Sequence, residues 1–275
     1  GSTVTIRDGN VILGTSVADS EGNFTLTLTP PKLNGETLTA NATDAAGNTG
    51  GASSGLNVSI DTTAPTISSV SVPSNGTYKL GQALDFTVNF DENVHLTGTP
   101  YIPITLNTGG TVNASYFGGN GTSAIVFRYT IVSGNLDADG VAVGASINLN
   151  GGTLKDTAGN DATLTLNSVG TTTNVLVDGV VPTVSSINRV SAANTNATSV
   201  QYTVTFSESV TGVDTSDFAL TTTGGVAGTI AAISGSGTTY TVTVNSITGD
   251  GTMRLDLKNS GTGITDAATN AIATG

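Results

Sequence analysis

A five-residue motif that returns at domain-length intervals constrains the fold of this chain more than any other feature. The motif reads Asp-Ala-Ala-Gly-Asn at 44–48, Asp-Thr-Ala-Gly-Asn at 156–160 and Asp-Ala-Ala-Thr-Asn at 266–270. Its copies are spaced by roughly 110 residues, a period that is typical of arrays of similar modules. The sequence therefore predicts tandem units rather than one large domain.

Two further acidic motifs repeat in phase with the first. Asp-Thr-Thr-Ala-Pro-Thr at 61–66 returns as Asp-Gly-Val-Val-Pro-Thr at 178–183. Phe-Asp-Glu-Asn-Val at 90–94 returns as Phe-Ser-Glu-Ser-Val at 206–210. Because these acidic motifs share one period, we interpret them as parts of one site that is built repeatedly.

The proline-containing motifs mark the module boundaries. Proline lacks an amide donor and restrains the residue before it, so each motif is predicted to form a short, stiff, extended linker. We place modules at 1–60, 66–177 and 183–275, joined by linkers at 61–65 and 178–182. The first module lacks an opening strand and the last stops just after a repeated motif, so we expect both ends to be cuts in a longer protein.

Each module carries short stretches in which large apolar residues alternate with polar ones. Such alternation is typical of half-buried antiparallel strands, and clusters of Gly, Asn and Asp separate the stretches. No stretch shows a sustained helical period. The sequence therefore predicts an all-β protein made of tandem immunoglobulin-like Greek-key β-sandwiches in an extended array. The alternating stretches are 24–28, 84–90, 125–131, 200–206 and 240–244, and a hairpin turn is predicted at 19–23.

The charge balance favours a cation as the partner and disfavours polyanions. The chain has 8 Lys and Arg against 20 Asp and Glu, a formal net charge of −12. Nucleic acid and anionic membrane surfaces need clustered basic residues, so neither is an expected partner. With no Cys and the single His95, the sequence offers no thiolate or multi-histidine metal site. No apolar run is long enough to insert across a membrane.

Strand direction predicts which acidic residues meet. Consecutive strands of a Greek-key sandwich mostly run antiparallel, so the strand that returns to a linker ends beside that linker. Residues far apart in sequence are thereby expected to form one acidic cluster at each joint. The predicted clusters are Asp61, Glu92 and Asp156 at the first junction and Asp178, Glu208 and Asp266 at the second.

Converging carboxylates repel one another unless a cation lies between them. Ca²⁺ takes about six to eight oxygen ligands from carboxylates, Asn side chains and backbone carbonyls, whereas Mg²⁺ demands a tight octahedral geometry. We therefore predict Ca²⁺ at both junctions. The expected uncharged ligands are linker carbonyls and the side chains of Asn48, Asn93, Asn160 and Asn270.

Four further aspartates are candidates for the same chemistry, each with a structural alternative. Asp137 and Asp139 begin a segment like a calcium loop, but Ile147 stands where an EF-hand needs Glu, so a turn is the favoured alternative. Asp44 would serve a junction upstream of the first module, and Asp8 would reach the first junction from the far end of its module. For every repeated turn, the alternative is an Asp that accepts hydrogen bonds from backbone amides.

The order and phase of these motifs resemble the repeat region of large secreted bacterial adhesins of the RTX or biofilm type, which is built from bacterial immunoglobulin-like domains. The likeness rests on the Asp-Ala-Ala-Gly-Asn turn with its Asp-Thr-Thr-Ala-Pro exit, on Leu-Asn-Gly-Gly-Thr-Leu-Lys-Asp at 149–156 and on Phe-Ser-Glu-Ser-Val-Thr-Gly-Val at 206–213. The resemblance implies extracellular extender domains, often with Ca²⁺ at their junctions as in cadherins. Two departures affect the second junction, since Gly-Val-Val-Pro follows Asp178 and Thr269 replaces the Gly of the turn.

We therefore expect a structural role at the bacterial cell surface. Ca²⁺ would fix the angle between modules, and the array would hold a distal domain away from the cell in adhesion or biofilm formation. The expected partners are calcium ions, neighbouring repeats of the same chain and a receptor that the sequence does not name. The alternative is that the second module itself recognises a glycan or a protein through Tyr101, Tyr116, Phe117 and Tyr129. Enzymatic activity is not expected, because no nucleophile motif is found.

Overall fold

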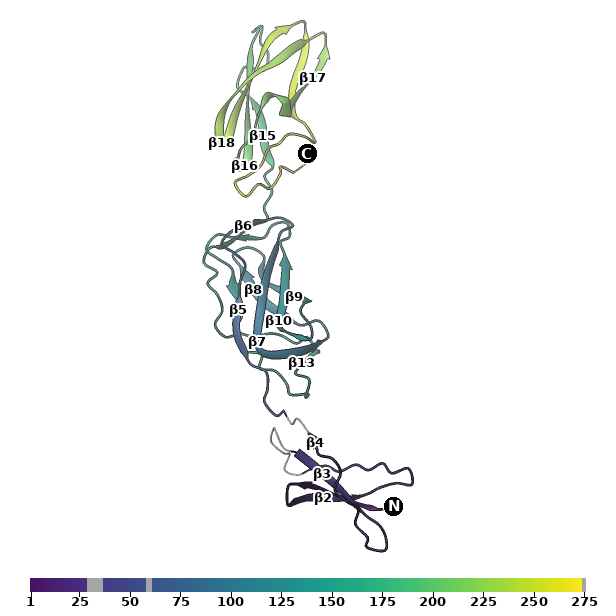
Figure 1. Ribbon diagram of the computed structural model, residues 1–275. Helices are drawn as coiled ribbons and strands as arrows, with labels where there is room; N and C mark the ends of the chain where they lie inside the picture. The colour runs from purple at the N-terminus through teal and green to yellow at the C-terminus, as the bar shows by residue number, and fades with distance from the viewer. Residues whose placement is uncertain (29–36, 58–60, 274–275) are drawn as a thin grey trace.

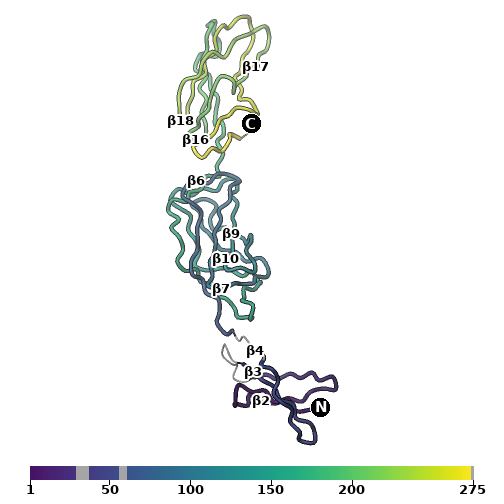
Figure 2. Tube along the Cα trace, in the orientation of Figure 1, coloured from purple at the N-terminus to yellow at the C-terminus, as the bar shows by residue number. Residues whose placement is uncertain are grey.

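The structure is a computed structural model that describes residues 1–28, 37–57 and 61–273. These residues form strands, turns and one short 3-10 helix, η1 (Thr215–Asp217), and contain no α-helix. Three β-rich units follow one another along an elongated molecule (Figure 1), and a single narrow connection joins the second unit to the third (Figure 2). The all-β prediction is confirmed. No helix of the described residues has the length and apolar character needed to cross a membrane.

Within residues 1–28 and 37–57, the first unit is built on one four-stranded sheet. Its central strands, β1 (Thr3–Asp8) and β3 (Thr37–Thr43), pair in antiparallel register along their whole length. β2 (Val11–Val17) flanks β1, and β4 (Leu56–Asn57) flanks β3. Val4 on β1 is buried.

The predicted strand at 24–28 is wrong, although its side chains face the sheet. These residues form no ladder. The apolar side chains Phe24, Leu26 and Leu28 nevertheless line a hollow of about 380 Å³ over β1 and β3. Alternation predicts which side chains point toward a core, whereas a ladder also needs a neighbouring strand within hydrogen-bonding distance.

The second unit contains the largest sheet. Its strands are β5 (Ile67–Ser71), β6 (Gly76–Lys79), β7 (Ala83–Thr97), β8 (Tyr101–Leu106), β9 (Gly110–Gly118), β10 (Thr122–Thr130), β11 (Leu136–Asp137), β12 (Ala142–Val143), β13 (Thr153–Lys155) and β14 (Val175–Asp178). The large sheet has the order β12-β8-β9-β10-β7-β13, and β5 also pairs with β7. A smaller sheet, β11-β14-β6, lies at the end that faces the third unit (Figure 1).

The core of the second unit is centred on β7 and β10. Phe86 and Phe127 are direct partners in the register of these strands, and both side chains are fully buried. The alternating stretches 84–90 and 125–131 therefore place their apolar residues inward, as predicted. β7 is longer than predicted, because its inward-facing alternation continues to Leu96.

The third unit has two sheets. β16 (Val200–Val210) pairs with β15 (Val184–Arg189) and with β18 (Ala227–Thr248), and β17 (Phe218–Gly224) pairs with β19 (Gly251–Leu257). The rings of Phe206 and Tyr240 meet edge to face at 5.8 Å between centroids. The Tyr240 hydroxyl donates a buried hydrogen bond of 2.8 Å to the Val210 carbonyl. The stretches 200–206 and 240–244 thus form strands, as predicted.

Truncation of Phe127 tests whether the second unit folds on its own core. Phe127→Ala removes a fully buried ring, so the free energy of unfolding of this unit is expected to fall by about 3–5 kcal/mol. Calorimetry of the full chain should show one transition move to a lower temperature while the others keep their midpoints. Phe117→Ala is the matched control, because that ring is 57% exposed. Equal calorimetric profiles for the two variants would contradict the conclusion that the second unit folds on a core containing Phe127.

Candidate metal centres

Among the described residues, two groups of three carboxylates form at the two linkers, from positions that lie far apart in sequence. Within each group, one oxygen from every carboxylate lies within 4.8 Å of the others. The first triad is Asp61, Glu92 and Asp156, and the second triad is Asp178, Glu208 and Asp266. These are the residues that strand direction places together.

Each glutamate occupies an inward-facing position of a long strand. In β7 the buried side chains alternate through Phe90 and Val94, and Glu92 lies half-buried between them. Glu208 lies in the same way between two buried residues of β16. A carboxylate thus stands where the alternation places apolar residues, and this costs free energy unless the charge is compensated.

Both glutamates also lie at a break in strand pairing. β10 pairs with β7 as far as Asn89 and pairs again at Val94. β18 pairs with β16 as far as Thr205 and pairs again at Val210. Irregularities of this kind bend a strand and change the direction of its side chains. In both units the break brings the glutamate to the end of the sandwich that faces the preceding linker.

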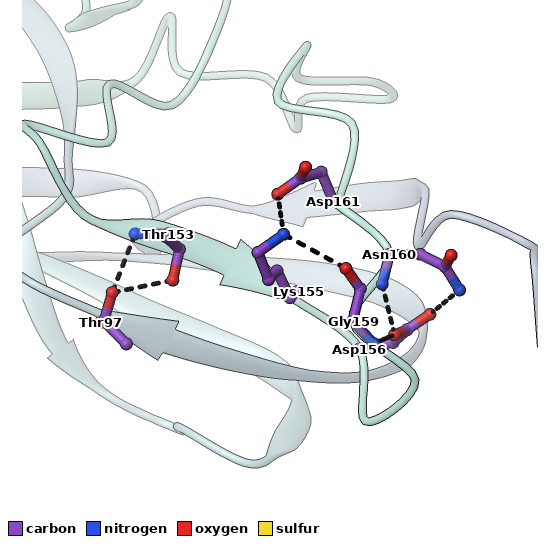
Figure 3. Close-up of polar contacts among 7 residues, drawn as sticks. All are labelled: Thr97, Thr153, Lys155, Asp156, Gly159, Asn160 and Asp161. Carbon is purple, nitrogen blue, oxygen red and sulfur yellow. Dashed lines mark hydrogen bonds and ion pairs between the residues drawn. The ribbon is translucent and has the colours of Figure 1, made fainter. Parts of the chain in front are cut away.

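The repeated turn supplies the third carboxylate of each triad. Asp156 Oδ1 accepts hydrogen bonds from the amides of Gly159 (2.6 Å) and Asn160 (2.9 Å), and Oδ2 accepts one from the Asn160 side chain at 2.7 Å (Figure 3). Asp266 accepts two corresponding bonds from Asn270, both of 2.8 Å. These bonds fix the orientation of the carboxylate, so the capping role weighed for this motif is present at both sites.

The asparagine of each turn also holds the linker. The Asn160 side chain donates to the carbonyl of Asp61 at 3.0 Å, and the Asn270 side chain donates to that of Asp178 at 2.9 Å. Each linker carboxylate accepts a bond from the amide two residues later, at 3.0 and 3.1 Å respectively. The two sites are therefore built by the same contacts, although their linker sequences differ.

Burial and mutual repulsion disfavour the charged forms of three triad carboxylates. Burial, and then the neighbouring Asp178 and Asp266, raise the pKa of Glu208. Burial and the surrounding carboxylates likewise raise the pKa of Glu92. Burial is the main cause that raises the pKa of Asp178. At Asp156 burial acts upward, but the hydrogen bonds of the turn outweigh it and lower the pKa.

The second triad contains a buried oxygen without a hydrogen-bond partner. Glu208 Oε1 has no partner among the described residues. Leaving a buried polar atom unsatisfied costs about 1–3 kcal/mol, and more for a charged group. Asp217 Oδ1 has the same property, but Asp217 belongs to the short helix η1 and to neither triad. A buried, unpartnered oxygen on a member of a group of three carboxylates fits a site for a cation.

The first triad has an additional carboxylate beside it. Asp91 accepts hydrogen bonds from the amide and hydroxyl of Thr66, at 2.8 and 2.5 Å, and these bonds lower the pKa of Asp91. Ser207 takes the corresponding place at the second site, where it accepts a bond of 2.9 Å from the Thr183 amide. The two sites therefore share a scaffold but differ in charge.

The structure does not bring Asp137 and Asp139 into either triad. Asp137 is buried and accepts bonds from the amides of Gly140 (2.7 Å) and Asn107 (3.1 Å). Asp139 accepts a bond of 2.9 Å from the Asn107 side chain. Both lie at the predicted end of the second unit, since β11 pairs with β14, but their oxygens hold two loops together. They therefore form the turn that was the alternative to a calcium loop.

Asp44 and Asp8 also lie outside the triads that the described residues form. Asp44 accepts bonds from the Asn48 amide (2.8 Å) and side chain (2.9 Å), in the same geometry as Asp156. A fourth copy of this turn occurs at 19–23, where Asp19 accepts a bond from the Asn23 amide at 2.9 Å. The predicted hairpin turn at 19–23 is thus a capped turn of the repeated kind, and its Asp-x-x-Gly-Asn spacing was the signal that could have identified it.

The four aromatic residues that were candidates for ligand recognition, Tyr101, Tyr116, Phe117 and Tyr129, do not form an exposed shelf. Phe117 alone among them is exposed, and the guanidinium of Arg128 lies 3.6 Å from its ring centroid. Tyr101, Tyr116 and Tyr129 are partly buried. The Tyr129 hydroxyl donates a bond of 2.6 Å to Asn135.

Comparison with known proteins supports the assignment of the first unit. The family described as bacterial Ig domain matches residues 1–59. A comparison with curated proteins gives no match. Bacterial Ig domains are common in extracellular and surface proteins, and their β-sandwich is typically not enzymatic. Beyond residue 59, the immunoglobulin-like character rests on the β-sheet architecture and on the repeated motifs.

The raised pKa of Glu208 predicts that, without an added cation, the third unit loses stability as the pH rises. A carboxyl whose folded pKa is raised stabilises the fold below its unfolded pKa, and this contribution is lost as the pH rises through the folded pKa. In EGTA at pH 7, Glu208→Gln should therefore raise the melting temperature of the third unit by about 4 °C, a shift equivalent to about 1 kcal/mol or less. The advantage should disappear as the pH falls toward 4.5, the ordinary pKa of a Glu.

Glu21→Gln is the control for this measurement. It changes the net charge by the same amount, and Glu21 is an exposed residue outside the triads. Calorimetry of both variants between pH 4 and 8 measures the difference. A lower melting temperature for Glu208→Gln at pH 7 in EGTA would show that the buried carboxylate is not destabilising.

Proposed function

We propose that this chain is a structural extender region of a bacterial cell-surface adhesin, in which Ca²⁺ stiffens the two joints between β-sandwich units. The observation that carries the proposal is the pair of matched carboxylate triads at the two linkers, one of which contains the unpartnered oxygen of Glu208. Their number equals the number of linkers, and each triad combines a linker residue with residues of the following unit.

The ligand set favours Ca²⁺ over other metals. Each triad offers carboxylate oxygens, and the carbonyl of its linker aspartate lies within reach of the same turn. Hard oxygen ligands suit Ca²⁺ and Mg²⁺, whereas Zn²⁺ and softer metals prefer nitrogen and sulfur. Ca²⁺ tolerates irregular geometry and a mixture of carboxylates and carbonyls, and Mg²⁺ requires a near-ideal octahedron.

The second site shows how an ion would act on the joint. Asp178 ends β14 in the second unit, whereas Glu208 and Asp266 belong to the third unit. A cation bound by all three would therefore cross-link two units through their own carboxylates. It would also replace repulsion among the carboxylates by attraction, and so add to the contacts that hold this joint.

The cellular role follows from this mechanical property. The bacterial Ig match of the first unit supports an extracellular or surface location. Extracellular Ca²⁺ modules bind the ion at roughly 10⁻⁴–10⁻³ M, a range in which the sites would be occupied outside the cell and the array would be stiffer there than at low Ca²⁺. A stiff array would hold a distal adhesive domain at a distance from the cell and so support adhesion or biofilm formation.

Removal of one triad at a time should remove one Ca²⁺ at a time. Isothermal titration calorimetry is expected to show two sites in the full chain, one site in Asp61→Asn/Glu92→Gln and one in Asp178→Asn/Glu208→Gln, because each pair removes two of three carboxylates. Asp139→Asn is the control and should retain both sites, since Asp139 lies outside the triads.

Small-angle scattering should show a larger maximum dimension with Ca²⁺ than with EGTA. An unchanged maximum dimension would contradict the mechanical role.

A second candidate function, recognition of a glycan or protein by the second unit, is favoured by one observation. Phe117 is 57% exposed beside an Arg128–Asp85 ion pair of 2.6 Å. Such a ring with fixed polar neighbours can stack on a sugar. Glycan-array binding that is lost in Phe117→Ala would support this role, and absence of binding by the parent chain would exclude the glycans on the array.

A further inference from the structure

The turn of the third unit differs from the other copies at its fourth position. Gly47 and Gly159 occupy this position with φ values of 87° and 98°, in the left-handed region that favours glycine. Thr269 occupies it in the third unit with a φ of 67°. A β-branched residue in this region is strained, and strain of this kind persists where the surroundings impose it.

The surroundings of Thr269 include a side chain from the neighbouring unit. Lys79, the last residue of β6 in the second unit, places its Nζ 3.1 Å from the Thr269 carbonyl and 3.0 Å from its hydroxyl. The next residue also takes part, because the Leu80 amide donates to Asn270 Oδ1 at 3.0 Å. Lys79 and Leu80 thus bind the turn from across the joint.

The second unit shows the same carbonyl bound in a different way. There Lys155, the residue before the turn, donates to the Gly159 carbonyl at 3.2 Å and pairs with Asp161 at 2.7 Å (Figure 3). Both lysines therefore bind the fourth carbonyl of a turn, but Lys155 acts within its own unit and Lys79 acts between units.

The third unit lacks its own lysine at the corresponding place. Lys155 and Asp161 also face each other in a backbone β-bridge, and Thr265 and Ala271 form the corresponding β-bridge in the third unit. Neither Thr265 nor Ala271 is charged, so the third unit has no ion pair at this place. The fourth carbonyl of the third turn is therefore left for a donor from outside the unit, and the added Thr269 hydroxyl provides a second acceptor for that donor.

We propose that Lys79 and Leu80 of the second unit form a direct lock with Thr269 and Asn270 of the third unit, and that this lock holds the second joint without a bound cation. The contacts use an ammonium group, a backbone amide, a hydroxyl, a carbonyl and an amide side chain, so they persist whether or not the second triad binds an ion. Lys79 of the second unit thus binds the turn of the third unit, in the role that Lys155 has for the turn of its own unit.

Spin-label distances across the second joint test the lock. The chain has no Cys, so Ser115→Cys and Ser236→Cys place labels at two exposed positions, one in each unit. In EGTA, the parent chain is expected to give one narrow distance distribution. Lys79→Met should increase the population outside this distribution by roughly tenfold, because both bonds of the ammonium group are lost.

Two further variants make the result specific. Lys155→Met removes the equivalent lysine of the second unit and should leave the distribution unchanged. Thr269→Gly should broaden the distribution moderately and also raise the melting temperature of the third unit, since it removes the hydroxyl acceptor and the backbone strain together. Equal distributions for Lys79→Met, Lys155→Met and the parent chain in EGTA would overturn the lock. Loss or retention of Ca²⁺ binding is measured separately by calorimetry, so failure of the lock and failure of the proposed cation sites are distinguishable.

Discussion

The repulsion among three carboxylates at each linker is the interaction on which the arrangement of the units depends. Each glutamate stands at an inward-facing position between buried apolar residues, where an uncompensated charge is unfavourable. The surrounding parts do not relieve this cost. The turn orients its Asp with internal hydrogen bonds, and its Asn fixes the linker carbonyl, so the carboxylates are held close together. A scaffold that keeps like charges together supports the proposal that a cation binds between them.

The two joints hold their carboxylates with the same turn and linker contacts but differ in the residues beside the triad. The first has Asp91 beside its triad, and therefore the larger negative charge to neutralise. The second has Ser207 at that place, a glutamate with a buried, unpartnered oxygen and a lysine that crosses the joint. We infer that the orientation at the first joint depends more strongly on the ion, whereas the second joint combines an ion site with direct contacts. A chain of such joints would then have segments of unequal stiffness.

The sequence predicted the parts of this structure that local pattern and strand direction determine. Alternation located the cores of β7, β10, β16 and β18, and the direction of successive strands placed Glu92 and Glu208 beside their linkers. One prediction failed, because residues 24–28 alternate but form no ladder, and their apolar side chains instead line a hollow over β1 and β3. Asp137 lies outside both triads and accepts hydrogen bonds from backbone amides, as the favoured turn requires. The Lys79–Thr269 contact could not be predicted from the sequence, because it depends on how two folded units dock.

Thr269 has both a local effect within its turn and a long-range contact across the second joint. Read within its own unit, it is an unfavourable replacement of glycine at a position with positive φ, worth about 1–3 kcal/mol of strain. Across the joint, its hydroxyl provides an acceptor for Lys79, whereas Gly159 at the same position of the second turn offers Lys155 only its carbonyl. The eroded copy of the turn is therefore the one that carries an additional task. At the second joint, the departure from the repeat thus coincides with a contact to the neighbouring module.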